Sequence, residues 1–298
     1  MAELSVISLG WGVQSFALAA MTAMRDERLT EIVTREGWRW PDLALHADTT
    51  WERSATYTFA EQMTPWLESR GLSVMTVNDG QQAIQATTAK TDCAFFTQYE
   101  KGAVGPHGDV IVPAFTAGTM SNVNGQLRRQ CTQRWKVVPQ QRYISAYLAE
   151  RKISKKLGVV QKWLGISLDE FERMRPSDVK YVQHCYPLVE MRMTRADCVQ
   201  WLQSHDLPVP MKSSCVFCPY HNARAWREMK REDGRDWQIA CEVDAAIRDK
   251  RPPYPLYVHS ARVPLPEAVQ IPADYGMDQT ELWSVEEAAI CDSGACFL

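Results

Sequence analysis

The 298-residue sequence lacks several features that would assign it to a specialised class of protein. It has no apolar run long enough to span a bilayer, and its start, Met-Ala-Glu-Leu, lacks the basic region of a signal peptide. It also lacks collagen-like repeats, heptad runs and low-complexity tracts. Neither sign of charge dominates, because 33 basic and 36 acidic side chains give a formal net charge of -3. We therefore expect a cytoplasmic globular protein without membrane contact, which would bind any polyanion through a local basic patch.

The nine cysteines are unevenly distributed. A reducing compartment disfavours structural disulfides, so metal ligands, catalytic thiols and free thiols are the alternatives. Cys215 and Cys218 form a C-x2-C motif, and Cys291 and Cys296 lie near the end of the chain. Three single cysteines are expected to be small buried hydrophobic residues: Cys93, Cys198 and Cys241.

Short apolar runs alternate with helical patterns in the first quarter of the chain. Strands are predicted over residues 4–8, 43–47 and 72–77, and helices over 16–24 and 57–70. Strands that alternate with helices in this way predict an α/β fold with a parallel sheet flanked by helices. Ligands of such sheets bind at the carboxyl ends of the strands.

The pattern is weaker in the middle of the chain. Residues 78–125 are expected to form a long loop or a small insertion. Helical character is predicted over 126–156, with an interruption near Pro139. Thr194 is expected to cap a helix that ends near residue 205.

A domain boundary is expected near residue 160. Residues 1–160 would form a nucleotide-binding α/β domain. Residues 161–298 would form a helical region that contains the C-x2-C motif and ends in a proline-rich extended segment and a tail.

The segment after the first predicted strand is suited to binding an anion. It reads Ser8-x-Gly10-x-Gly12-x-Gln14-Ser15 and leads directly into a helix. The glycines allow close approach, the two hydroxyl groups can form hydrogen bonds, and the helix N-terminus offers backbone N–H groups. The segment is neither a Walker A motif nor a Gly-x-Gly-x-x-Gly motif. A glycine-rich turn without a ligand is the alternative interpretation.

This loop resembles the PP-loop, S-x-G-x-D-S, of the N-type ATP pyrophosphatases and the PAPS (phosphoadenosine phosphosulfate) reductase superfamily. Gln14 stands where an acidic residue is common. Asp48-Thr49-x-x-Glu52 is similar to an Asp-Thr-x-x-Glu element that lies beside the nucleotide phosphates in this superfamily. A carboxylate at this end of a strand suits Mg²⁺ or a ribose hydroxyl, although Asp48 could also serve as a helix cap.

A third segment, Cys131-Thr132-x-x-x-Lys136-x-x-Pro139, resembles the Cys-Thr/Cys-x-x-x-Lys-x-x-Pro block of the assimilatory sulfonucleotide reductases. The resemblance covers nearly the whole chain and implies an adenine nucleotide α-hydrolase-like fold with a C-terminal helical region that bears cysteines. Basic side chains around this segment form a local patch suited to phosphate or sulfate: Arg128, Arg129, Arg134, Lys136 and Arg142.

The resemblance leaves three alternatives for the cysteines. In cluster-bearing adenylylsulfate reductases, the ligands are a tandem Cys-Cys and a later C-x2-C, but here Thr132 follows Cys131. One alternative is a [4Fe-4S] cluster on Cys131, Cys215 and Cys218, with an open iron or a fourth cysteine. A second is Zn²⁺ on the same three cysteines and His221, and a third is redox thiols without a metal. The candidates for the fourth cysteine are Cys185, Cys291 and Cys296.

The resemblance also implies one of two chemistries. PP-loop ATPases cleave ATP between the α- and β-phosphates and adenylate an oxygen of the acceptor, which sulfur or nitrogen then replaces. In the reductases, a cysteine thiolate attacks the sulfate sulfur of PAPS or APS (adenylylsulfate). Those enzymes carry this cysteine on a mobile C-terminal segment, for which Cys296 is the candidate.

We favour the first chemistry. ATP would bind at residues 8–15 with Mg²⁺ near Asp48, assisted by Lys136 and Arg134. A cluster or a cysteine persulfide would supply sulfur, which requires a sulfur donor or a thiol reductant as partner. The acceptor would be a base in DNA, a tRNA or a free nucleotide. A different alternative is a nucleotide-binding subunit of a nucleic-acid modification system that has no turnover alone.

Overall fold

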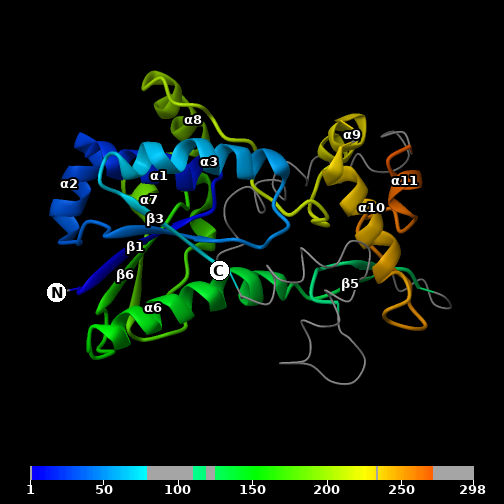
Figure 1. Ribbon diagram of the computed structural model, residues 1–298, viewed down its shortest axis with the longest axis horizontal. Helices are drawn as coiled ribbons and strands as arrows, with labels where there is room; N and C mark the ends of the chain where they lie inside the picture. Colours follow the sequence, from blue (N-terminus) through cyan, green and yellow to red (C-terminus); the bar gives the residue numbers. More distant parts are fainter. Residues whose placement is uncertain (1, 79–109, 119–124, 233, 271–298) are drawn as a thin grey trace.

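The computed structural model describes residues 2–78, 110–118, 125–232 and 234–270 (Figure 1). Most of the loop expected over 78–125 therefore lies outside the described residues, as do Cys93, Cys291 and Cys296. In the described part of the chain, no helix is long and apolar enough to cross a membrane.

A five-stranded parallel sheet forms the centre of the larger part of the molecule. Its order is β3-β2-β1-β6-β7. Strands β1, β2 and β6 are buried along their whole length: apolar residues dominate β1 and β2, whereas β6 also buries Gln161 and Lys162. The predicted α/β fold with a parallel sheet and flanking helices is confirmed. The strands are β1 (Leu4–Leu9), β2 (Leu43–Ala47), β3 (Ser73–Val77), β6 (Val160–Leu164) and β7 (Val182–Cys185).

Helices cover both faces of this sheet (Figure 1). One face packs against five helices around a core that includes Phe16, Trp163 and Leu202. These helices are α1 (Val13–Met24), α2 (Glu27–Glu36), α3 (Ser54–Glu68), α7 (Pro187–Glu190) and α8 (Arg195–Ser204). On the other face, α6 (Val138–Glu150) places Ile144 and Leu148 against the strands. A 3-10 helix, η3 (Leu168–Arg173), follows β6.

Local sequence signals explain several helix ends. Thr194 caps α8, and its side chain forms a capping box with Asp197, as predicted for this position. Gly71, after α3, has a left-handed φ of 83°, which glycine adopts readily. Pro139 does not interrupt a helix. It is the second residue of α6, which continues directly from the π-helix η2 (Thr132–Val137), so the chain stays helical through this position.

A second, smaller part of the molecule is built around an antiparallel three-stranded sheet. It has its own core, to which Phe217, Trp226 and Leu256 contribute. We call it the small-sheet module (residues 110–131, 213–232 and 234–270, within the described ranges). Its elements are β4 (Phe115–Thr116), β5 (Gly125–Gln126), β8 (Leu256–Tyr257), α9 (Ala223–Glu232), α10 (Arg235–Ile247) and α11 (Leu265–Ala268).

The predicted boundary near residue 160 does not separate these two parts. Residues 160–164 and 182–185 are strands β6 and β7 of the large sheet, because β6 pairs in parallel with β1. Conversely, residues 110–118 and 125–131 belong with the small-sheet module. Residues 125–126 form a strand rather than the start of a helix, because they pair with β4.

The topology singles out the carboxyl end of the central strand β1 as a place where a ligand could bind. From β1 the chain first builds β2 and β3 on one side and later returns to build β6 and β7 on the other. Loops diverge at such a switch point, and ligands of parallel sheets bind there.

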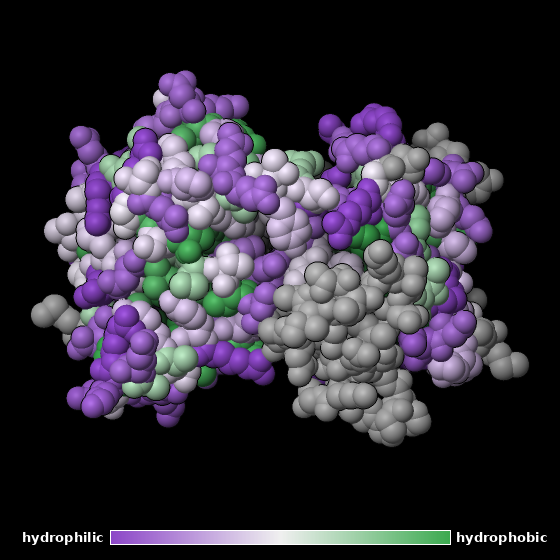
Figure 2. All heavy atoms as spheres, in the orientation of Figure 1, coloured by the Kyte–Doolittle hydropathy of each residue, from purple (hydrophilic) through white to green (hydrophobic). Residues whose placement is uncertain are grey.

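Figure 2 shows mostly polar side chains on the outer helices, whereas apolar side chains gather between α3 and α6. The edge strand β3 runs in this region, and Met75 is exposed there.

Candidate functional site

The loop between β1 and α1 lies at the switch point and forms the first part of the site. Gly12 is the N-cap residue of α1, and no side chain caps the helix, so its first N–H groups are available to an anion. The Ser15 hydroxyl closes the loop: it accepts a hydrogen bond from the Gly10 N–H at 3.1 Å and donates to the Gly12 carbonyl at 3.2 Å. Trp11 has a left-handed φ of 57°, and such strain concentrates at binding sites.

Two residues predicted to bind the nucleotide, Ser8 and Gln14, form hydrogen bonds with neighbouring elements. Ser8 Oγ donates to Gln140 Oε1 of α6 at 3.1 Å. The Gln14 amide donates to Ser167 Oγ at 3.4 Å and to Glu170 Oε2 at 3.3 Å. Gln14 and Glu170 are both buried. An acidic residue at position 14 would face the Glu170 carboxylate, so an amide is the electrostatically compatible side chain here.

Gly165, directly after β6, packs against the start of α1. A Cβ atom at this position would lie 2.8 Å from both Cα and N of Ser15 and 3.1 Å from the carbonyl carbon of Gln14. Its φ is not in the left-handed region. The need for glycine here therefore comes from the close approach of two backbones, and this contact fixes the loop between β1 and α1 against the neighbouring strand.

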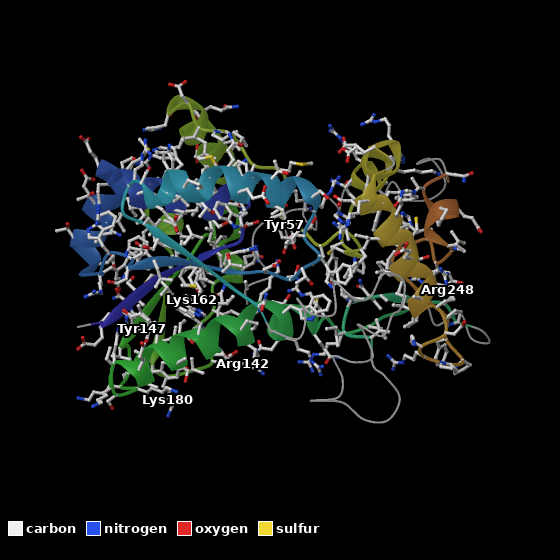
Figure 3. The ribbon with its side chains drawn as sticks, viewed as in Figure 1. Tyr57, Arg142, Tyr147, Lys162, Lys180 and Arg248 are labelled. Carbon is white, nitrogen blue, oxygen red and sulfur yellow. The ribbon has the colours of Figure 1, made fainter. Side chains whose placement is uncertain are left out.

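The segment after β2 supplies two carboxylates. Asp48 Oδ1 accepts hydrogen bonds from the Thr50 N–H at 2.7 Å and from the Tyr57 hydroxyl at 2.8 Å. The Tyr57 oxygen in turn accepts from the Glu52 N–H at 3.3 Å. Burial and the nearby Asp48 charge raise the pKa of Tyr57, so its phenol remains a donor. Tyr57 projects from the first turns of α3 (Figure 3). Thr50 has a left-handed φ of 63°, which is unusual for a β-branched residue.

Glu52 is the most connected side chain of the site. Its Oε1 forms an ion pair with Lys136 Nζ at 3.1 Å and accepts from Thr49 Oγ1 at 3.3 Å, while Oε2 accepts from Ser213 Oγ at 3.3 Å. The side chains of Glu52 and Lys136 are only 1% and 6% exposed. Because buried charges are tolerated only when paired and hydrogen-bonded, this network holds Lys136 of η2 beside the end of β2.

The C-x2-C motif joins this network. Glu52 and Cys215 form an antiparallel β-bridge, and Cys215 Sγ lies 3.4 Å from Thr49 Oγ1. Cys131, Cys215 and Cys218 line one small pocket, together with Lys136. The sequence predicted that these three thiols would meet, and the structure brings them to the side of the Asp48–Glu52 segment.

The described residues do not form a metal ligand set as they stand. Among them, no group of three His, Cys, Asp or Glu side chains is arranged to hold a metal ion. Burial, and then the Glu52 charge, raise the pKa of Cys215 well above its usual value, although a metal ligand must be a thiolate. Cys185 is buried in the core beneath α1 and α7, where burial raises the pKa of its thiol to about 12. It does not line the pocket of the other three.

Two buried histidines donate hydrogen bonds to backbone carbonyl groups of the site. His221 Nε2 donates to the Cys215 carbonyl at 2.9 Å, and burial lowers the pKa of His221 to about 3. His221 therefore holds the C-x2-C turn as a neutral donor through Nε2, and its role as a zinc ligand stays a prediction. His46 Nδ1 donates to the Leu9 carbonyl at 3.0 Å, and its ring contacts Trp11 edge-on. Burial lowers the pKa of His46 as well.

The predicted basic patch is spread over different depths. Lys136 is buried, Arg134 is half-buried in η2, and Arg142 is exposed on α6 (Figure 3). Arg128 is exposed, whereas Arg129 lines the cysteine pocket. One guanidinium nitrogen of Arg134, Nη1, is buried without a hydrogen-bond partner within the described ranges.

A latch of ion pairs and hydrogen bonds joins the start of α3 to the small-sheet module. Arg53 Nη2 pairs with Glu232 Oε2 at 2.9 Å, and its Nε lies 3.4 Å from Asp236 Oδ2. Asp236 also accepts a hydrogen bond from the Ser54 hydroxyl at 2.6 Å and from the Ser54 N–H at 3.2 Å. A carboxylate from α10 thus caps the N-terminus of α3 and holds both parts around the site.

Sequence reasoning missed several contributors. Tyr57 lies in a helix whose spacing indicated only a packing face, and Gly165 lies in a run that looked like core. Ser213 adjoins the C-x2-C motif and was the one residue with a usable signal. The proposed nucleophile Cys296 lies outside the described residues.

The chain matches no protein-family model, and it has no significant similarity to a curated protein sequence.

Proposed function

We propose that this chain is a PP-loop enzyme of the ATP pyrophosphatase type that adenylates an acceptor for sulfur transfer. The proposal includes the adenine nucleotide α-hydrolase-like variant of the α/β fold. The observation that supports it is that three residues meet near the carboxyl ends of the parallel strands. Lys136 pairs with Glu52, and Glu52 forms a β-bridge with Cys215. Segments more than 70 residues apart in the sequence meet there, each with the residue types that the chemistry needs.

The phosphates of ATP would bind the loop between β1 and α1. Gly10 and Gly12 leave room for a phosphate, and the N–H groups at the start of α1 would donate to its oxygens. Ser15 would exchange its bond to the Gly12 carbonyl for one to a phosphate oxygen. The indole N–H of Trp11 is a further donor, because it is buried without an acceptor among the described residues.

Asp48 is the better candidate of the two carboxylates for a magnesium ligand. Glu52 is already neutralised by the ammonium group of Lys136. Asp48 accepts only uncharged donors, the Thr50 N–H and the Tyr57 hydroxyl, through Oδ1 in the described structure. Hard oxygen ligands from one or two carboxylates, together with phosphate oxygens, are typical of Mg²⁺ bound to a nucleotide.

Adenylation would proceed by displacement at the α-phosphorus. The acceptor oxygen forms a bond to this phosphorus, and the bond between the α-phosphorus and the bridging oxygen breaks, so that pyrophosphate leaves. Lys136 and Arg134 of η2 would stabilise the charge that develops on the phosphates. The unpartnered Nη1 of Arg134 favours this role over a purely structural one, whereas exposed Arg142 is less suited to it.

The cysteine pocket would handle the sulfur. A persulfide on one cysteine attacks the activated carbon, AMP leaves, and a mixed disulfide forms between product and protein. A second cysteine then releases the thiolated product and leaves a protein disulfide, which a thiol reductant reduces. Cys131 and Cys218 suit these two roles better than Cys215, whose surroundings favour the neutral thiol. The [4Fe-4S] cluster stays a prediction, tested by iron, sulfide and zinc analysis of anaerobically prepared protein.

Release of pyrophosphate from labelled ATP tests the proposal directly. Full-length protein is incubated with Mg²⁺, candidate acceptors (DNA, tRNA and free nucleotides) and either [γ-³²P]ATP, whose label leaves with pyrophosphate, or [α-³²P]ATP, whose label stays with AMP. We expect acceptor-dependent pyrophosphate and AMP. Lys136→Met should lower the rate by about 100-fold or more, because it removes a preorganised cation. Lys156→Met removes an exposed lysine and serves as the matched control.

Two outcomes would contradict the proposal. Sulfite formation from PAPS or APS without pyrophosphate release from ATP would identify a sulfonucleotide reductase. Tight nucleotide binding without turnover, together with a co-purifying nucleic acid or protein partner, would identify a binding subunit. Equal rates for Lys136→Met and wild type would remove Lys136 from the machinery.

A further inference from the structure

A lysine lies buried in the large sheet, away from the site described above. Lys162 is in the middle of β6, where it pairs with Val6 of β1 on one side and with His184 of β7 on the other. Its strand neighbour on the same face, Val160, belongs to the core beneath α6. Lys162 therefore lies between the strands and α6, on a sheet face where Val6 and Val160 are apolar and His184 is its polar cross-strand neighbour (Figure 3).

Two lysines of the described residues are buried, and Lys162 differs from Lys136 in having no counter-ion among those residues. Lys136 pairs with Glu52 at 3.1 Å, whereas Lys162 has neither an ion pair nor a hydrogen bond within the described ranges. It is 4% exposed. Burial alone lowers its pKa to about 8, so most of it is still cationic at pH 7. A buried, uncompensated charge is costly, and a structure retains one most readily where an anion can bind it.

A cavity of about 60 Å³ adjoins this lysine. Aliphatic side chains form much of its wall, and α6 contributes no charged group to it. The segment 175–179 provides Arg175 and Asp178, and β7 provides His184, whose Nδ1 donates to the Arg175 carbonyl at 2.9 Å. Burial lowers the pKa of His184, so it is neutral above pH 7. The aliphatic lining residues are Val137, Ile144, Val179 and Val182.

We propose that this cavity is a binding site for a short-chain monocarboxylate. The carboxylate group pairs with Lys162, and the alkyl group packs against the aliphatic wall. Such a cavity has room for several waters or for one molecule of a few heavy atoms, which excludes a nucleotide. The charged groups of the lining, Lys162, Arg175 and Asp178, carry one net positive charge beside an aliphatic wall, so the lining favours a ligand with one negative charge and an apolar end.

Calorimetric titration of propionate into the full-length protein at pH 7 and constant ionic strength tests this site. We expect saturable binding with a Kd of about 1 to 100 mM, since small ligands gain little per atom. Propionamide has the same shape without the charge and should bind at least tenfold more weakly. Lys162→Met should have the same effect, whereas Lys180→Met, which removes an exposed lysine near the same segment (Figure 3), should bind as wild type does.

The dependence on pH provides a second readout. Affinity should fall up to tenfold for each pH unit above about 8, because Lys162 loses its proton there. Equal binding of propionamide and propionate, unchanged binding by Lys162→Met, or no binding of propionate at about 100 mM would each overturn the proposal. The comparison of propionate with propionamide uses only the wild-type chain, so it decides the matter even if Lys162→Met fails to fold.

Discussion

A methyl group at position 165 would collide with the loop proposed to bind phosphate. In Gly165→Ala, the new Cβ would lie 2.8 Å from two backbone atoms of Ser15. Non-bonded carbon atoms rest at about 3.5 Å or more, so β6 and α1 would have to separate by roughly 0.7 Å. Backbone at the start of a helix cannot rotate away as a side chain does. Overpacking of this kind costs about 1 to 3 kcal/mol of unfolding free energy.

The sign of the change in unfolding free energy distinguishes a close contact at Gly165 from open space. Gly165 does not have a left-handed φ, so alanine fits its backbone conformation. If there were space for the methyl group, Gly165→Ala would stabilise the protein by about 0.4 to 1 kcal/mol, through the reduced entropy of the unfolded chain. A stabilised variant in urea unfolding would therefore refute the close contact between β6 and the loop.

Nucleotide binding separates a local effect from a global one. Movement of the loop by several tenths of an ångström should weaken ATP binding by about tenfold or more, because the N–H donors would be misaligned. Gly234→Ala is the control, since the nearest atom to its Cβ is Glu232 O at 3.9 Å. It removes the N-cap glycine of α10 and should lower stability slightly, with unchanged ATP affinity. Unchanged ATP affinity in Gly165→Ala would exclude the loop as the nucleotide site.

Three other perturbations have definite expected results. Gln14→Glu places a second carboxylate beside Glu170 and should cost about 1 to 3 kcal/mol in urea unfolding, and Glu170→Gln in the same chain should restore part of the loss. Lys136→Met leaves the Glu52 carboxylate buried without its cation and should cost about 3 to 5 kcal/mol; a loss below 1 kcal/mol would contradict the ion pair. His221 has a pKa of about 3 when folded and a higher one when unfolded, so the unfolded state binds the proton first as pH falls. Stability should fall between pH 6.5 and 3 by roughly 4 kcal/mol from this residue, and unfolding curves of His221→Gln over that range should be flatter.

Local signals in the sequence determined the parts of the fold that were predicted. The first three strands are short apolar runs, and the Thr194 cap lies three residues from Asp197, so each can be recognised without tertiary information. Strand β6 has no such signal, because Lys162 interrupts its apolar pattern. It is a strand because it pairs with β1, more than 150 residues earlier in the chain. The same dependence on distant pairing explains why β6 and β7, which follow the boundary predicted near residue 160, belong to the large sheet.

In the candidate site, several residues could be predicted from the sequence, whereas their contacts with one another could not. The resemblance singled out Asp48, Glu52 and Lys136, and the C-x2-C spacing singled out Cys215, but neither predicted how these residues contact one another. The bridge between Glu52 and Cys215 joins residues 163 positions apart, so nothing in either motif predicts it. Tyr57 was missed because a tyrosine in a helix is usually a packing residue, and its hydroxyl gains a role only where Asp48 lies next to it.

The latch at the start of α3 makes the two parts of the molecule mutually dependent. A fragment ending at residue 205 would retain every strand of the large sheet, yet it would leave the guanidinium of Arg53 without Glu232 and Asp236. The same cut would expose the carboxylate of Glu52, which would lose Ser213 and the bridge to Cys215. The sheet and the small-sheet module must therefore be expressed together, because the chain after residue 205 completes the folded structure of residues near 50.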